Sequence, residues 1–166
     1  MSTMGNLQEA FAGESQANRK YLAFAKKAEA DGYPQIAKLF RAAAEAETIH
    51  AHAHFRVMDG IKDTTANLKS AIEGEGFEFQ EMYPKFLAEA QAEGLKPAEF
   101  SFKNALAVEE IHYGLYSKAL EAVTSGSDLS ETAIYVCPVC GNTVEGNVPD
   151  TCPVCNVPGS KFFEIA

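Results

Sequence analysis

Apolar residues recur every three or four positions along most of the chain, and this period predicts four long helices. The predicted helices cover about residues 6–30, 34–59, 67–93 and 97–124. Asp31-Gly32-Tyr33-Pro34 combines a helix stop with a helix start, so the second helix should return antiparallel to the first. Asn67 is the expected N-cap of the third helix, which can break or kink at Gly74 and Gly76. The first part of the chain is therefore predicted to be a mainly α bundle.

The helical period of apolar residues ends before the C-terminal segment of the chain. Residues 133–166 are rich in Val, Pro, Gly and Cys, and no helical period continues there. A segment this short cannot fold on a hydrophobic core alone and needs a metal to staple it. We therefore expect two domains, a helical one over residues 1–132 and a small metal-stapled one over residues 133–166.

Composition and charge narrow the function classes. The 166 residues carry a formal net charge of −9, which argues against nucleic acid as a partner. No apolar run approaches the ~20 residues that span a bilayer, so no membrane association is expected. The N-terminus lacks a basic start and an apolar signal core, which predicts a cytoplasmic protein.

Two Glu-x-x-His pairs lie in the middle of predicted helices, Glu47 with His50 and Glu109 with His112. Residues three apart leave a helix on the same face, so each pair can present two ligand atoms together. A single pair is more often solvated surface, but two pairs plus glutamates on the other two helices form the ligand set of a di-iron carboxylate bundle. The predicted ligands are Glu14, Glu47, His50, Glu78, Glu81, Glu109 and His112. Carboxylates and imidazoles suit two iron ions, with manganese or zinc as alternatives.

All four cysteines lie in the last 30 residues as two Cys-x-x-Cys pairs, Cys137 with Cys140 and Cys152 with Cys155. In a reducing compartment such pairs favour a metal over disulfides. Four thiolates fit one iron or one zinc ion in a tetrahedral site, and the spacing does not decide between them. A redox di-iron site on the same chain favours iron, because it has a use for a one-electron carrier.

With both sites in hand, the chain resembles the rubrerythrins along its whole length. The matching segments are residues 13–17, 47–50, 78–84 and 109–112 and the two cysteine knuckles, each of which begins Cys-Pro-Val-Cys. The resemblance implies a ferritin-like four-helix bundle followed by a rubredoxin-like domain. One departure is Asn156, where rubredoxin knuckles usually carry glycine; asparagine tolerates a left-handed backbone.

The family's activity is what the resemblance implies for this chain: reduction of hydrogen peroxide to water at the di-iron site. Electrons would come from a donor protein or reductase through the rubredoxin-like iron. In the family, one iron exchanges a histidine for a carboxylate as its oxidation state changes, and His50 and Glu81 are the residues matched to that role. Three alternatives stay open: a ferroxidase or iron-storage protein, an oxidase that consumes dioxygen, and a zinc-stapled interaction protein without enzymatic activity.

The link between the second and third helices raises a question of reach. In a ferritin-like bundle these helices run parallel, so their link must cover roughly 30 Å, whereas the steps from Gly60 to Asn67 reach at most ~25 Å. Either the third helix melts up to Gly74 and Gly76, or the last two helices pair with the first two of another subunit. We favour the second, a domain-swapped homodimer.

Overall fold

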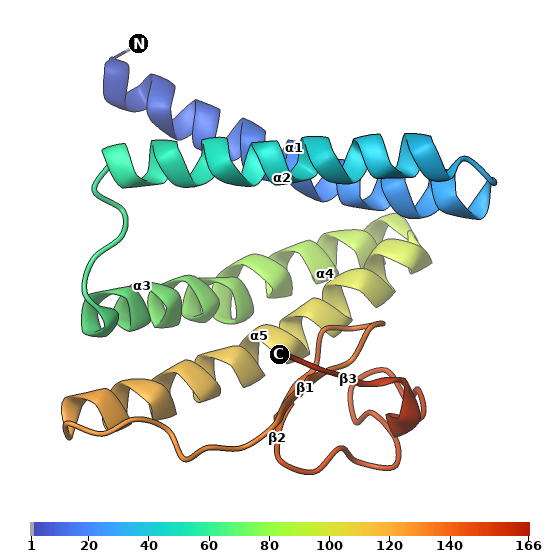
Figure 1. Cartoon of the computed structure of the whole chain (residues 1–166). Helices are drawn as coiled ribbons and strands as arrows, with labels where there is room; N and C mark the ends of the chain where they lie inside the picture. The colour runs from blue at the N-terminus through green and yellow to red at the C-terminus, as the bar shows by residue number, and fades with distance from the viewer. Residues whose placement is uncertain (1) are drawn as a thin grey trace. The chain divides into compact units, whose positions relative to one another are not determined.

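The computed structural model describes residues 2–166, which are mainly helical (Figure 1). The helical elements are α1 (Thr3–Ala30), α2 (Pro34–Val57), α3 (Thr64–Phe77), the π-helical turn η1 (Glu78–Met82), α4 (Tyr83–Glu93), α5 (Lys96–Thr124) and the 3-10 turn η2 (Gly159–Lys161). Three short strands are β1 (Ile134–Val136), β2 (Thr143–Glu145) and β3 (Phe163–Glu164). The chain divides into two compact units, one ending at Lys62 and the next beginning at Asp63. Within the described residues, no helix has an apolar stretch long enough to cross a bilayer.

The first unit is a hairpin of α1 and α2, which pack antiparallel as the short connection predicted (Figure 1). Gly32 turns the chain with a φ of 82°, a left-handed conformation that glycine adopts without strain. Small side chains let the two helix backbones lie close together; the buried alanines are Ala25, Ala28, Ala37, Ala44 and Ala51. Nearer the open end, the rings of Phe11 and Phe55 stack at 4.9 Å between centroids.

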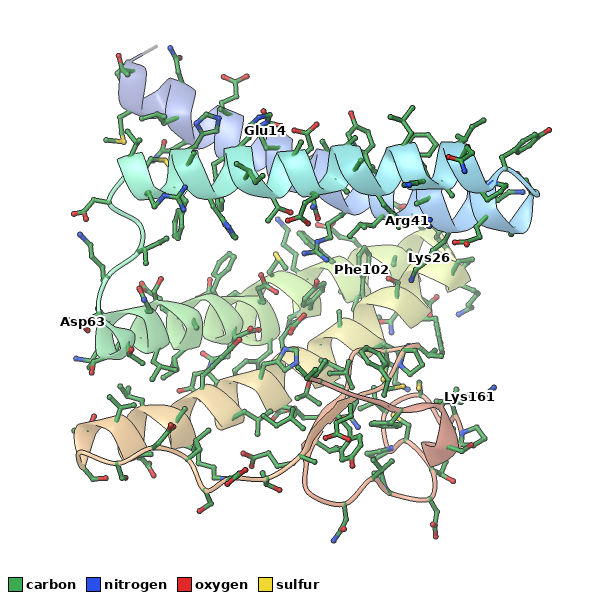
Figure 2. All side chains as sticks on the ribbon, in the orientation of Figure 1. Glu14, Lys26, Arg41, Asp63, Phe102 and Lys161 are labelled. Atoms are coloured by element: carbon green, nitrogen blue, oxygen red, sulfur yellow. The ribbon has the colours of Figure 1, made fainter. Side chains whose placement is uncertain are left out.

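The link from α2 to α3 consists of residues 58–63, and the backbone N–H groups of its first three residues bond back to carbonyls of α2. The Gly60 N–H donates to the Phe55 carbonyl at 2.9 Å, and the Phe55 ring leaves no room for a side chain at Gly60. α3 begins at Thr64 because the Asp63 carboxylate accepts from the Ala66 N–H at 2.8 Å. The prediction that Asn67 caps this helix was wrong, since Asp63 offers the same chemistry one turn earlier. Figure 2 labels Asp63 at this helix start.

In the second unit, α3, η1 and α4 pack along α5 (Figure 1). The α-helix continues through Gly74 and Gly76, so the helix does not break at its glycines. The irregularity comes directly after them, in the wide π turn of residues 78–82. Gly94 ends α4 with a φ of 70°, as its place after the last helical residue predicted.

The C-terminal segment of the second unit forms a three-stranded antiparallel sheet in the order β2-β1-β3. Tyr135 in the central strand lies opposite Val144 on one side and Glu164 on the other. β2 also contacts α5, where Lys118 forms an ion pair with Glu145. The predicted domain boundary at residues 132–133 falls inside this second unit, in the loop between α5 and β1.

Candidate metal centres

The hairpin of α1 and α2 carries one carboxylate–histidine cluster. Glu14 comes from α1 (Figure 2), Glu47 and His50 come from α2, and their ligand atoms lie within 4.8 Å of one another. The His50 Nδ1 atom is 3.0 Å from the Glu47 Oε2 atom, as the three-residue helical spacing predicted. Buried Asn18 fixes the two helices at this level, because its Nδ2 atom donates to the Ala44 carbonyl at 2.7 Å. The structure thus brings three predicted ligands together in the first unit.

The second unit carries a cluster with the same composition, formed by Glu75, Glu109 and His112. The His112 Nδ1 atom is 2.8 Å from the Glu109 Oε2 atom and 3.8 Å from the Glu75 Oε1 atom. All three side chains are half-buried. Glu109 and His112 were predicted from the sequence, whereas Glu75 was missed.

Hydrogen bonding beyond this cluster assigns the tautomer of His112. The Thr143 hydroxyl donates its proton to the Gly141 carbonyl at 3.1 Å, so its oxygen accepts from the His112 Nε2–H at 3.0 Å. In the neutral ring, this leaves the Nδ1 lone pair facing the oxygens of Glu75 and Glu109. The His112 Nδ1 atom and one carboxylate oxygen from each of Glu75 and Glu109 can therefore bind the same cation. Carboxylate with imidazole is a donor set that iron accepts.

The surroundings of the second cluster perturb its carboxyl groups. Burial, a hydrogen bond to Glu109 and the Glu109 charge raise the pKa of Glu75 to about 7. Burial and the Glu109 carboxylate also raise the pKa of Glu78, while the His112 charge lowers it. Burial, followed by the charges of Glu78, Glu109 and Glu75, raises the pKa of the Tyr83 hydroxyl. Glu78 and Tyr83 therefore lie within electrostatic reach of the cluster, and Tyr83 keeps its phenolic proton at neutral pH.

Glu81, the remaining predicted ligand, has a different environment. It is exposed, and among the described residues it belongs to neither carboxylate–histidine cluster. The cause is η1: hydrogen bonds from residue i to i+5 widen the turn, so residues three apart within it no longer share a face. Glu75 precedes Glu78 by three residues on the regular side of this turn. The signal that could have found Glu75 was thus the same spacing applied toward the N-terminus.

The four cysteines form the third cluster. Their sulfur atoms lie within 4.8 Å of one another, with Cys137 to Cys155 and Cys140 to Cys152 both at 3.6 Å. A disulfide needs about 2.05 Å, so these are free thiols. A tetrahedral ion with metal–sulfur bonds of ~2.3 Å has sulfur–sulfur edges of about 3.8 Å, which the observed spacing fits.

The two knuckles have the same backbone geometry. Gly141 and Asn156 have φ values of 86° and 63°, and their N–H groups donate to the Cys137 and Cys152 carbonyls. The left-handed backbone expected at Asn156 is confirmed. Burial opposes ionisation of Cys152, but the N–H groups of Cys155 and Val154 outweigh it and lower the pKa of Cys152 to about 6. A metal ligand must be a thiolate, so this geometry prepares Cys152 for ligation.

Comparison with known proteins agrees with both kinds of site. The chain matches the Rubrerythrin family over residues 5–120 and the rubrerythrin rubredoxin-like domain over residues 135–163. It is 36% identical to Rubrerythrin-2 of Clostridium acetobutylicum, covering 94% of this chain and 92% of that protein. It is 37% identical to nigerythrin of Nitratidesulfovibrio vulgaris, covering 97% of this chain and 85% of that protein. Nigerythrin in its mixed-valence state has a similar structure, with a TM-score of 0.57 and 34% identity over 99% of this chain and 87% of the other.

The fold and the sites define a ferritin-like di-iron protein with a rubredoxin-like domain. The chain belongs to the rubrerythrin family. Its cofactors are accordingly a di-iron centre held by carboxylates and imidazoles and a single iron held by four cysteines.

Proposed function

We propose that this chain reduces hydrogen peroxide to water, with electrons supplied through the cysteine iron by a donor protein or reductase. The observation that supports this best is the packing of the cysteine module on α5, the helix that carries Glu109 and His112. An iron-storage protein has no use for such a module. A zinc-stapled interaction protein has no use for two carboxylate–histidine clusters beside the cysteines.

The proposed di-iron ligands combine the two helical clusters with the neighbouring Glu78. They are Glu14, Glu47, His50, Glu75, Glu78, Glu109 and His112. This set differs from the sequence-based one in a single residue, Glu75 in place of Glu81. Glu81 is the weaker candidate because it is exposed and outside both clusters.

The bound irons supply Lewis acidity and electrons for breaking the O–O bond of the peroxide. The chain's own residues prepare the site around them. Thr143 keeps the His112 Nε2 atom protonated and its Nδ1 atom free for ligation. Tyr83 holds its proton next to three carboxylates, so its hydroxyl can donate to an anionic oxygen bound at the site.

We also propose that the working form is a homodimer in which each di-iron site takes one cluster from each chain. In a ferritin-like bundle α2 and α3 run parallel, and both clusters lie in one layer. From His50 to the end of α2 is ~10 Å along the axis and from Thr64 to Glu75 is ~17 Å, so the link would have to cover roughly 27 Å. Gly60 is already bonded back to Phe55, and the steps from Gly60 to Thr64 reach at most ~14 Å. The alternative, in which α3 melts up to Gly74 and Gly76 to lengthen the link, has less support, because α3 is helical from Thr64 onward.

Rapid mixing of the iron-loaded, fully reduced protein with hydrogen peroxide or with dioxygen tests the reaction. We expect oxidation by peroxide to be faster by at least about tenfold. Equal rates would replace the peroxidase by an oxidase or ferroxidase. Metal analysis with visible absorption of the thiolate–iron bands tests the cysteine site, and a colourless protein that holds only zinc would contradict the electron-transfer role. The expected cytoplasmic location stays a prediction.

A further inference from the structure

One short segment of the cysteine module contacts both kinds of site in the second unit. Residues 141–143 follow the first knuckle and lead into β2. The Asn142 side chain is 1% exposed, and its Nδ2 atom lies 3.7 Å from the Cys152 sulfur, to which it donates. The adjacent Thr143 accepts from His112 Nε2 at 3.0 Å. Successive side chains of an extended segment point to opposite faces, which is how neighbours reach opposite partners.

The backbone completes the connection between these two contacts. The Thr143 hydroxyl donates to the Gly141 carbonyl at 3.1 Å, and Gly141 is bonded directly to Cys140. The Cys137 N–H donates to the Asn142 carbonyl at 2.9 Å. A continuous path of covalent and hydrogen bonds therefore runs from the cysteine sulfurs through Gly141 and Thr143 to the ring of His112.

The surrounding packing holds this path in place. Gly141 lies against α5, where a side chain at this position would meet the Val108 methyl group. The ion pair between Lys118 and Glu145 ties β2 to α5 on the same strand face as Thr143. The His112–Thr143 contact itself lines a mostly apolar cavity of about 280 Å³, bounded by Leu115 and Ile134.

We propose that Asn142 and Thr143 form a two-residue bridge between the cysteine iron and His112, the histidine that the same chain contributes to the di-iron centre. The proposal rests on the proposed function. The cysteine iron would supply electrons one at a time, and two electrons from an external one-electron carrier, with two protons, would balance the reduction of one hydrogen peroxide to two waters. Thr143 acts as a positioning residue for His112. Asn142 stabilises negative charge on the Cys152 sulfur and so favours the reduced cysteine iron.

Three variants at Thr positions separate the bridge from general packing. Thr143→Val keeps the shape but removes the hydroxyl, Thr143→Ser keeps the hydroxyl, and Thr151→Val is a control at an exposed position of the same module. The full-length, iron-loaded protein is reduced with dithionite, freed of excess reductant and mixed with hydrogen peroxide. We expect Thr143→Val to slow re-oxidation of the cysteine iron about tenfold more than it slows the first oxidation of the di-iron centre, and both rates are measured in the same mixing experiment. Thr143→Ser and Thr151→Val should behave as the wild type.

A second readout does not depend on turnover. In zinc-loaded protein labelled with ¹⁵N-histidine, the His112 Nε2–H should give a slowly exchanging proton signal. Thr143→Val should abolish that signal and Thr143→Ser should retain it. For the other half of the bridge, Asn142→Leu should lower the reduction potential of the cysteine iron in a spectroelectrochemical titration and leave the His112 signal in place.

The outcomes separate this proposal from the proposed function. Slow oxidation of the wild-type di-iron centre by peroxide would overturn the peroxidase assignment, whereas the histidine signal would still report the contact. Fast oxidation by peroxide together with unchanged re-oxidation of the cysteine iron in Thr143→Val would overturn the bridge. An unchanged reduction potential of the cysteine iron in Asn142→Leu would show that Asn142 is not part of the bridge.

Discussion

The two carboxylate–histidine clusters have the same three ligand types but different surroundings. The His50 side chain is 56% exposed, whereas the His112 side chain is 27% exposed and is bonded through its second nitrogen to Thr143. Glu78 and Tyr83 also lie within electrostatic reach of the second cluster. The cluster in the unit that carries the cysteine module is thus oriented in advance, and the hairpin cluster is open. In the proposed di-iron site, the open cluster is therefore the one whose ligands would gain most order from the other cluster.

The first prediction concerns a variant whose longer link lets one chain supply both clusters to the same di-iron site. Insertion of about ten Gly and Ser residues after Ile61 adds more than the missing reach to the link. We expect the wild-type chain to be a dimer and this variant to be a monomer that still binds two irons. Size-exclusion chromatography with light scattering measures the change.

A matched control inserts the same residues after Ser127, in the exposed loop between α5 and β1, and should leave the dimer intact. A wild-type monomer that holds both irons at low concentration would contradict the swapped arrangement.

The second prediction tests which glutamate completes the second cluster. Glu75→Ala should lower the iron content of the di-iron site and reduce peroxide turnover by about 100-fold or more, since a ligand contributes at least as much as its supporting residues. Glu81→Ala should keep both irons and near-normal turnover. Metal analysis and peroxide kinetics measure both variants. The opposite result would restore the sequence-based assignment of Glu81.

The difference between Glu75 and Glu81 shows where reading the sequence reaches its limit. Helical period placed Glu47 beside His50 and Glu109 beside His112, because both pairs lie in regular α-helix. Glu81 was predicted from its place near the middle of the third helix and from the family resemblance, and it stays a prediction. Nothing in the local composition announces the π turn at residues 78–82, which leaves Glu81 outside both clusters of the described residues. Thr64 begins α3 for a similar reason: Asp63 and Asn67 are both good caps, and only packing decides between them.

Contacts between distant elements were beyond the sequence altogether. The spacing of the cysteines predicted their cluster, because both knuckles are local structures. The bonds from Thr143 to His112 and from Asn142 to Cys152 depend on how the sheet lies on α5 and on which face each side chain takes. Neither residue type is unusual for a loop, so no pattern marks them.

The third prediction concerns pH in the metal-free protein. The pKa of Glu75 is about 7 in the folded protein against an ordinary value of 4.5. Between these values the folded state holds a proton that the unfolded state has lost, so stability falls as pH rises from about 4.5 to 7. Below 4.5 the contribution is fully present, and above 7 it is gone. The full shift corresponds to about 3 kcal/mol, and because solvent screens this half-buried group we expect a smaller loss, on the order of 2 kcal/mol, measured by chemical denaturation at a series of pH values.

Glu75→Gln should flatten this dependence, and Glu73→Gln, at an exposed position of the same helix, should not. If the free energy of unfolding of Glu75→Gln fell as steeply with pH as that of the wild type, another titrating group would be responsible for the loss.

The smallest expected effect comes from removing the Asn18 hydrogen bonds that join α1 to α2 beside the hairpin cluster. Asn18 donates to the Ala44 carbonyl at 2.7 Å and to the Thr48 hydroxyl at 2.8 Å, one turn from Glu14 on α1 and beside Glu47 on α2. Asn18→Ala removes both bonds, but the Ala44 carbonyl keeps the Thr48 hydroxyl as a donor, so no buried acceptor is left bare. We expect a loss of about 1 kcal/mol in the free energy of unfolding, measured by urea denaturation, and none for exposed Asn6→Ala.

Weaker iron binding at the di-iron site of Asn18→Ala, with the iron content of the four-cysteine site unchanged, would show that the open cluster depends on the Asn18 hydrogen bonds. Unchanged iron binding would show instead that the other half of the site orients it.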